Sequence, residues 1–158
     1  ALRMARASVD IVTPYFIPDA TILSALRVAG LSGVRVRVVL PRHTDHRFMA
    51  WAARACMHDL VESGVEVWEI PAGFAHSKLM IVDGRWSLSG SSNMDPRSFR
   101  LNFEFNVEAW SQPLANELTA YVEDHISSSR RVTERTLRAV PKLLRLRNQV
   151  VKLFSPYL

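Results

Sequence analysis

The pattern of apolar and polar residues in the first half of the chain predicts strands that alternate with helices. Residues 8–13, 34–40 and 65–70 are short runs rich in valine and isoleucine, as is typical of buried strands. Residues 19–29 and 45–62 instead repeat apolar side chains at helical spacing, and a glycine lies just after each segment. Strands that alternate with helices in this way indicate α/β layers.

A run of strands is expected in the second half. Residues 78–83 and 86–89 flank an Asp-Gly turn signal, and residues 90–97 are expected to form a loop or a short turn of helix. Residues 101–110 alternate between apolar side chains and Asn or Glu, which predicts a strand with two different faces. Residues 112–129 are expected to form a helix. The complete order predicts an α/β fold, a mixed β-sheet flanked by helices on both faces.

Charge divides the chain into two unequal parts. Residues 130–158 hold eight basic residues and one acidic residue, a net charge of +7, whereas residues 1–129 hold 12 basic and 14 acidic residues. We expect residues 1–129 to form a catalytic half-domain, and residues 130–158 a basic amphipathic helical tail that packs on it or beside it. A basic tail favours an anionic partner such as a membrane surface, but the acidic body argues against nucleic acid.

Length and composition set further limits. The 158 residues suffice for one ordinary domain, and 48% hydrophobic with 22% charged residues is typical of a folded protein. Cys56 is the one cysteine, so no intrachain disulfide is possible, and no apolar run is long enough to span a membrane. Because the chain starts at Ala1 rather than Met, we expect it to be a piece of a longer protein.

The residues with the clearest chemistry lie around the fourth predicted strand. His76 and Lys78 are two residues apart, so in an extended strand their side chains point to the same side. A histidine beside an ammonium is a poor metal site but a good site for a phosphate, which Lys78 can hold while His76 attacks phosphorus or transfers a proton. Asp83 is seven residues after His76 and faces the other way in a regular strand, which predicts a structural or orienting role.

A polar loop follows this strand pair. Gly90, Ser91 and Asn93 offer a hydroxyl, an amide and backbone N–H groups in a short segment. Groups of this kind bind phosphate oxygens. We therefore expect the loop to belong to the same site.

The spacing H-x-K-x4-D followed by G-S-x-N resembles the HKD signature of the phospholipase D superfamily. Four further stretches resemble the C-terminal half of bacterial cardiolipin synthases. They are TPYFIPD at residues 13–19, T-D-H at 44–46, NMDPRSFRLNFEFNVE at 93–108 and LFSPYL at the end of the chain. The resemblance covers nearly the whole chain.

The resemblance implies phosphatidyl transfer through a phosphohistidine. One histidine takes the phosphatidyl group and a second protonates the leaving alcohol, without a metal or other cofactor. With phosphatidylglycerol as acceptor the products are cardiolipin and glycerol, and with water the product is phosphatidic acid. The implied partners are anionic phospholipids and a membrane surface, and the implied location is the bacterial cytoplasmic membrane.

The resemblance also extends the candidate site. Glu104 is a candidate to accept a hydrogen bond from the His76 ring and fix its tautomer. His46 is a candidate to contact a lipid headgroup. Arg97 and Arg100 flank the motif loop, where they either pair with acidic neighbours or help to hold a lipid phosphate.

The chain departs from the two-motif pattern of these synthases, because none of its other histidines has a lysine at the motif spacing. The missing histidine must come from an N-terminal HKD half of the same enzyme or from a second copy of this chain. Two other functions are therefore kept open. One is a homodimeric phosphodiesterase or nuclease with a single motif, and the other is a half-domain that binds anionic membranes without catalysis.

Overall fold

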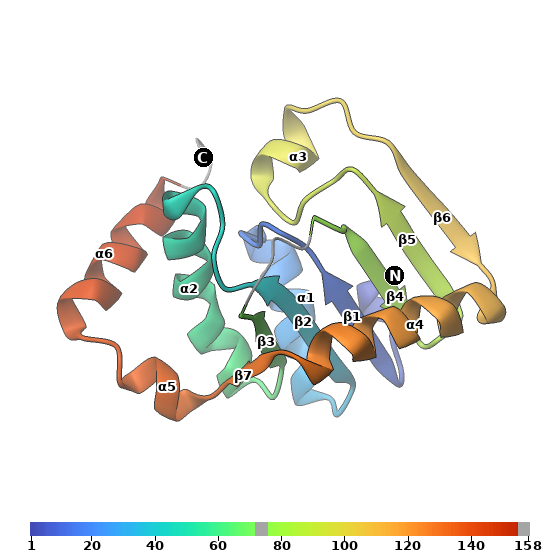
Figure 1. Ribbon diagram of the computed structural model, residues 1–158, viewed down its shortest axis with the longest axis horizontal. Coiled ribbons are helices and arrows are strands. Elements are labelled where there is room, and N and C mark those ends of the chain that lie inside the picture. The colour runs from blue at the N-terminus through green and yellow to red at the C-terminus, as the bar shows by residue number, and fades with distance from the viewer. Residues whose placement is uncertain (72–75, 155–158) are drawn as a thin grey trace.

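The computed structural model describes residues 1–71 and 76–154, and its centre is a seven-stranded mixed sheet (Figure 1). The strand order is β6-β5-β4-β1-β2-β3-β7, with β1, β2 and β3 parallel and the other pairs antiparallel. The mixed sheet confirms the predicted fold class. The strands are β1 (Ser8–Val12), β2 (Arg35–Pro41), β3 (Glu66–Ile70), β4 (Leu79–Val82), β5 (Trp86–Gly90), β6 (Asn106–Trp110) and β7 (Arg130–Val132).

Helices cover both faces of the sheet, as the sequence predicts. The first two long helices pack on one face, and α4 crosses the other (Figure 1). The helical segments are the 3-10 turn η1 (Leu2–Met4) and the α-helices α1 (Ala20–Leu31), α2 (Arg47–Glu62), α3 (Pro96–Arg100), α4 (Gln112–Ser127), α5 (Glu134–Arg138) and α6 (Lys142–Leu153).

Alternation along the inner strands explains this layering. On β2, Val38 packs into the cluster with Leu60 of α2, whereas its neighbour Val39 packs with Ala115 and Val122 of α4. The apolar run from Val38 to Pro41 is therefore buried on both faces of the sheet.

Two capping residues start helices where the sequence suggests. The Asp19 carboxylate accepts a hydrogen bond from the Ile22 backbone N–H at 2.8 Å and begins α1. Ser111 caps α4 in the same way through the Leu114 N–H. Each cap satisfies a backbone donor that the helix itself leaves unpaired.

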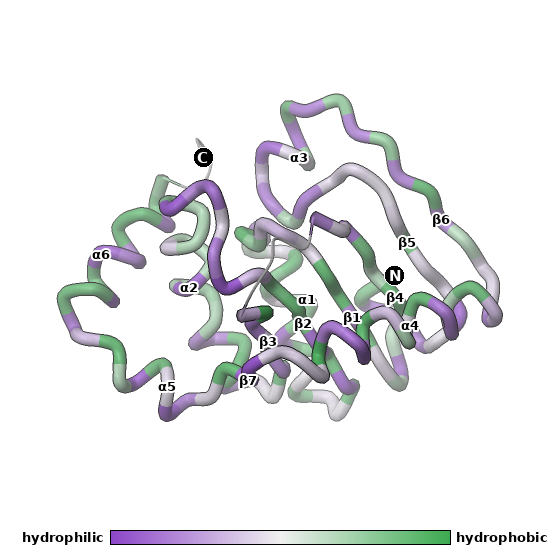
Figure 2. Tube along the Cα trace, in the orientation of Figure 1, coloured by the Kyte–Doolittle hydropathy of each residue, from purple (hydrophilic) through white to green (hydrophobic). Residues whose placement is uncertain are grey.

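The start of the basic tail differs from its prediction. Helix α4 ends at Ser127, and Arg130–Val132 form β7 against β3 instead of beginning a helical tail. Val132 supplies the reason, because it is buried in the main core next to Val67. Apolar and polar residues then alternate through α5 and α6, and α6 packs against α2 (Figures 1 and 2). Residues 155–158, which end the LFSPYL stretch, lie outside the described residues.

The predicted strand at residues 101–110 is shorter than expected. Only Asn106–Trp110 pair with β5, and the preceding residues form a turn and an irregular segment. The apolar side chains of this irregular segment, Phe103 and Phe105, are exposed, as is Val107 on the edge strand β6.

No helix among residues 1–71 and 76–154 combines the length and the apolar character that a membrane span requires.

Candidate active site

His76 and Lys78 meet just before β4, at the end of the sheet where that strand begins. Both residues precede β4, so the predicted strand starts one residue late, at Leu79. The Lys78 Nζ lies 3.0 Å from His76 Nδ1, 3.2 Å from Nε2 and 2.8 Å from the His76 carbonyl oxygen. Ser77 between them shares a 2.6 Å hydrogen bond with the Tyr121 hydroxyl on α4. The extended alternation that the spacing predicts is thus present without a regular strand.

Lys78 is half-buried, and its surroundings act on its charge in two directions. Burial lowers the pKa of the ammonium, and the nearby carboxylates of Glu104 and Asp95 offset part of that effect. The net result is a pKa below the ordinary lysine value. A partly desolvated ammonium beside an imidazole is suited to bind an anionic phosphate oxygen.

Gly90 brings the polar loop to this pair. Its backbone N–H donates to the Lys78 carbonyl oxygen at 3.3 Å. A Cβ at Gly90 would overlap the Phe105 carbonyl oxygen and lie 2.7 Å from the Asn106 Cα. The loop can follow this path only because position 90 has no side chain.

Ser91 and Glu104 form one hydrogen-bonded unit. The Ser91 hydroxyl donates to the Glu104 carboxylate and accepts from the Phe105 N–H at 2.9 Å. Asn102 also donates to Glu104, at 3.2 Å. The hydrogen bond from Ser91 lowers the pKa of Glu104 despite a smaller opposing effect of burial. The structure thus brings Glu104 to the polar loop, and its proposed contact with the His76 ring stays a prediction.

Asn93 and Met94 connect the polar loop to α3 and to the TPYFIPD stretch at residues 13–19. Its backbone N–H donates to the Ser98 hydroxyl at 3.1 Å, and the Ile17 N–H donates to the carbonyl oxygen of Met94 at 2.7 Å. The side-chain Oδ1 of Asn93 is buried and accepts no hydrogen bond within the described residues. An acceptor in this state favours a ligand that brings its own donor.

A hollow of about 300 Å³ opens beside the loop and contains one predicted headgroup residue. It is lined by His46 and Asn93 together with Tyr15, which the sequence analysis left without a role. The Tyr15 hydroxyl donates to Asp45, and burial is the main reason that the pKa of Tyr15 is raised. The feature of the sequence that could have pointed to Tyr15 is its position within the TPYFIPD stretch. Of the two predicted arginines, Arg97 lines the hollow, whereas Arg100 lies at the end of α3 and does not line it.

Asp83 lies at the opposite end of β4 from Lys78, about 16 Å away along an extended chain. Its carboxylate accepts hydrogen bonds from the backbone N–H groups of Arg6, Ala7 and Ser8 at 2.8–3.1 Å. Burial raises the pKa of Asp83, but these donors outweigh it and the pKa is lowered. Asp83 therefore fastens the segment before β1 to the turn after β4.

One group of side chains among the described residues could hold a metal ion, and it lies on α2. His58, Asp59 and Glu62 present ligand atoms within 4.8 Å of one another. His58 already contacts Glu62 at 3.4 Å. None of the three is a predicted site residue.

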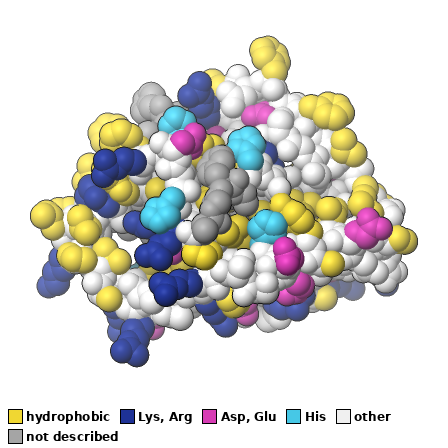
Figure 3. All heavy atoms as spheres, viewed as in Figure 1, with side chains coloured by type: hydrophobic (Ala, Val, Ile, Leu, Met, Phe, Trp, Pro, Cys, Tyr) yellow, Lys and Arg dark blue, Asp and Glu magenta, His cyan; other side chains and the backbone are white. Residues whose placement is uncertain are grey.

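The side chains gathered here have the chemistry that binding of an anionic phosphate ester requires. An imidazole that can attack phosphorus lies against an ammonium, and a loop with hydroxyl and amide groups is bonded to the same strand. Histidine side chains surround the middle of the face shown in Figure 3. This combination is suited to phosphoryl-ester chemistry in which histidine is nucleophile or acid.

Solved structures identify the class of fold. The chain is similar to Nuc of Salmonella typhimurium, a phospholipase D family member, with a TM-score of 0.75 and 26% identity. The match covers 85% of this chain and 87% of that one. A phosphatidylserine synthase of Haemophilus influenzae has the same fold, with a TM-score of 0.73 and 17% identity over 98% of this chain and 42% of that chain. The fold is that of the phospholipase D superfamily.

Sequence comparison identifies the family. Residues 1–126 match the family described as "Cardiolipin synthase, PLD-like domain", and the chain belongs to this family. It is 39% identical over 154 residues to the major cardiolipin synthase of Bacillus subtilis, and 41% identical over 158 residues to a cardiolipin synthase of Alkalihalophilus pseudofirmus. These matches cover 98% and 99% of this chain but 32% and 31% of the relatives. The chain thus spans about a third of the length of the curated relatives it matches.

Proposed function

We propose that this chain is the HKD half of a cardiolipin synthase that carries His76. Together with a second HKD half, it transfers a phosphatidyl group from one phosphatidylglycerol to another. The single observation that carries the proposal is the Lys78 ammonium against the His76 ring, next to the loop that begins at Gly90. Family membership supports the choice of lipid substrate over other phosphate esters.

The proposed reaction has two steps that share two histidines. One imidazole nitrogen attacks phosphorus of the donor, and glycerol leaves with a proton from the other histidine. The hydroxyl of a second phosphatidylglycerol then attacks the phosphohistidine. It gives its proton to the histidine that protonated glycerol in the first step. Cardiolipin is released and both histidines return to their starting states. Lys78 holds the anionic oxygens of the phosphate in both steps, where charge stabilisation is most effective.

The second half is proposed to cover the apolar edge beside the loop. Leu101, Phe103 and Phe105 are 71%, 107% and 75% exposed and flank Glu104, which is bonded to the loop through Ser91. Exposed apolar surface of this kind marks an interaction site. A partner on this edge would bring its own histidine close to His76.

The proposed location is the anionic surface of a bacterial membrane. The tail carries a net charge of +7, and Leu143, Leu146 and Leu153 are exposed on α6. Each basic residue close to an anionic surface contributes about 1 kcal/mol of binding. Binding to vesicles should therefore need anionic lipid and weaken with added salt.

The proposal is tested by analysis of lipid products. The chain is incubated with phosphatidylglycerol vesicles, alone and with a second HKD half, and products are quantified by mass spectrometry. Cardiolipin and glycerol in equal amounts are expected when both halves are present. Phosphatidic acid as the sole product would show a hydrolase instead. The absence of any product, with both halves folded and DNA cleaved in a parallel assay, would replace the proposal with a nuclease.

A further inference from the structure

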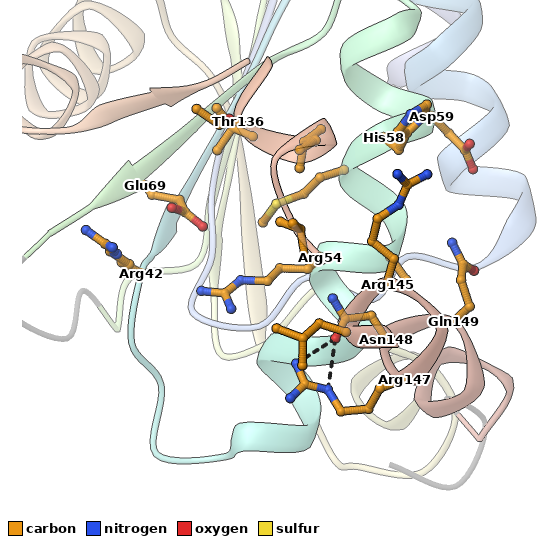
Figure 4. A pocket seen from close by; sticks show the side chains of 16 residues that line it. Arg42, Arg54, His58, Asp59, Glu69, Thr136, Arg145, Arg147, Asn148 and Gln149 are labelled. Carbon is orange, nitrogen blue, oxygen red and sulfur yellow. Dashed lines mark hydrogen bonds between the residues drawn. The ribbon is translucent and has the colours of Figure 1, made fainter. Parts of the chain in front are cut away.

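A second pocket lies between α2 and the tail arm, by which we mean helices α5 and α6. Its volume is about 480 Å³, and none of the nine predicted site residues lines it. Its walls come from α2, the ends of β2 and β3, strand β7 and the tail arm (Figure 4). It shares no lining residue with the hollow beside the polar loop.

Positive charge in this pocket is not fully compensated. Arg42, Arg54 and Arg145 line it, and none of them makes an ion pair with any carboxylate in residues 1–71 and 76–154. Glu69 and Asp59 are the acidic residues of the lining. Basic side chains also gather on the left of the face in Figure 3.

Arg147, the fourth arginine of the lining, is held by the protein itself. Its guanidinium stacks on the Trp51 ring at 3.9 Å and donates to the Asn148 Oδ1 at 2.9 Å. These contacts connect Trp51 to the pocket wall and make its indole a reporter of occupancy.

Arg42 and Arg54 form one corner of the pocket. Figure 4 shows the Arg54 side chain extending from α2 toward Arg42 and Glu69. Arg42 and Glu69 also border an adjacent hollow of about 430 Å³, to which Arg130 and Arg131 contribute. Arg131 is paired with Glu66 at 3.4 Å, whereas Arg42, Arg54 and Arg130 make no ion pair among the described residues. Paired guanidinium groups are the preferred partners of phosphate oxygens.

Apolar side chains continue from this corner toward the tail arm. Met57 of α2, Val140 before α6 and Leu144 on α6 line the pocket. Inorganic phosphate would leave this part of the wall exposed to water. An amphiphile with a phosphate at one end would cover it and gain the free energy of apolar burial.

We propose that this pocket binds an anionic amphiphile, with its phosphate held by Arg42 and Arg54 and its apolar part against Met57, Val140 and Leu144. Arg42 directly follows β2, which is two strands from β4, and Lys78 does not line the pocket. The pocket is therefore a second lipid site, and binding to it requires no turnover.

The test measures binding by the indole N–H signal of Trp51 in nitrogen-15 spectra. All samples carry His76→Ala so that the lipid stays intact. Monomeric dihexanoylphosphatidylglycerol is the probe, with dihexanoylphosphatidylcholine and inorganic phosphate as comparisons. We expect saturable shifts with the first lipid, and binding at least tenfold weaker for both comparison ligands.

Variants locate the site. The double variant Arg42→Gln/Arg54→Gln should bind phosphatidylglycerol at least tenfold more weakly, whereas the control Arg85→Gln/Arg135→Gln, with equal loss of charge outside the pocket, should bind within twofold of its parent. Leu144→Gln should weaken binding of the lipid but not of phosphate. Equal affinity in the Arg42/Arg54 variant would overturn the proposal. Phosphate binding as tight as lipid binding would overturn its amphiphile part and assign a free phosphate.

Discussion

Replacement of Asp83 separates a structural role from a catalytic one. The carboxylate holds three backbone N–H groups, of which the Ser8 bond at 2.9 Å is half-buried and the Arg6 and Ala7 bonds are exposed. A hydrogen bond to a charged group contributes about 1.5–3 kcal/mol when water cannot replace it. The exposed bonds contribute less because water can replace them. Asp83→Ala should therefore lower the free energy of unfolding by about 2–3 kcal/mol. The residue also has a φ of 53°, which adds about 1 kcal/mol for alanine.

The substitution Asp83→Asn isolates the charge. Asparagine tolerates the left-handed backbone and keeps one acceptor oxygen, so a loss of about 1 kcal/mol is expected. Because the folded state lowers the pKa of Asp83, its stabilisation is complete above the unfolded value of about 3.9 and is lost as the pH falls through the lower folded value. The difference in stability between the wild-type protein and the Asp83→Asn variant should therefore shrink below about pH 4.

Urea unfolding followed by tryptophan fluorescence at about pH 7 and about pH 3 measures both effects. Asp124→Asn is the matched control, because Asp124 is exposed on α4. Asp83→Asn should keep most of its phosphatidyl-transfer activity while it loses stability. Unchanged stability at neutral pH together with abolished activity would refute the structural assignment and make Asp83 a direct reactant.

Three further substitutions test other parts of the structure. Asp10→Ala removes the carboxylate 2.6 Å from buried Arg37 but leaves the ion pair of Arg37 with Glu123, so about 1–3 kcal/mol should be lost in urea unfolding. Gly90→Ala forces a Cβ onto the Phe105 carbonyl, so about 1–3 kcal/mol of stability should be lost with most of the activity, and wild-type values would contradict the close approach. Lys78→Met should slow phosphatidyl transfer about 100-fold or more at an unchanged unfolding midpoint, and a smaller effect would exclude Lys78 as the phosphate ligand.

The central layers of the fold could be predicted because local pattern and burial agree there. Valine-rich β2 is apolar at successive positions and is covered on both faces. The edges could not be predicted in the same way. The alternation at residues 101–110 predicts one strand, but pairing with β5 begins only at Asn106. Strand β7 is too short to show a period.

The candidate site was predictable where spacing carries the chemistry. His76 and Lys78 meet because an extended backbone repeats every two residues, and Gly90 was expected beside them. The contacts of Glu104 and Tyr15 depend on loops whose course sequence spacing does not determine. Ser91, rather than regular strand geometry, brings Glu104 to the site, and the hydrogen bond from Tyr15 to Asp45 joins residues 30 positions apart.

The catalytic role of His76 is tested most directly by comparing two histidines that lie near the same end of the sheet. Initial rates of cardiolipin formation from phosphatidylglycerol are measured for His76→Ala and His43→Ala, each supplied with the same second HKD half. His43 is an exposed residue in the loop after β2 and serves as the matched control. At least a thousandfold loss is expected for His76→Ala, and a rate within threefold of wild type is expected for His43→Ala. Cardiolipin formed at an undiminished rate by folded His76→Ala protein would contradict this catalytic role.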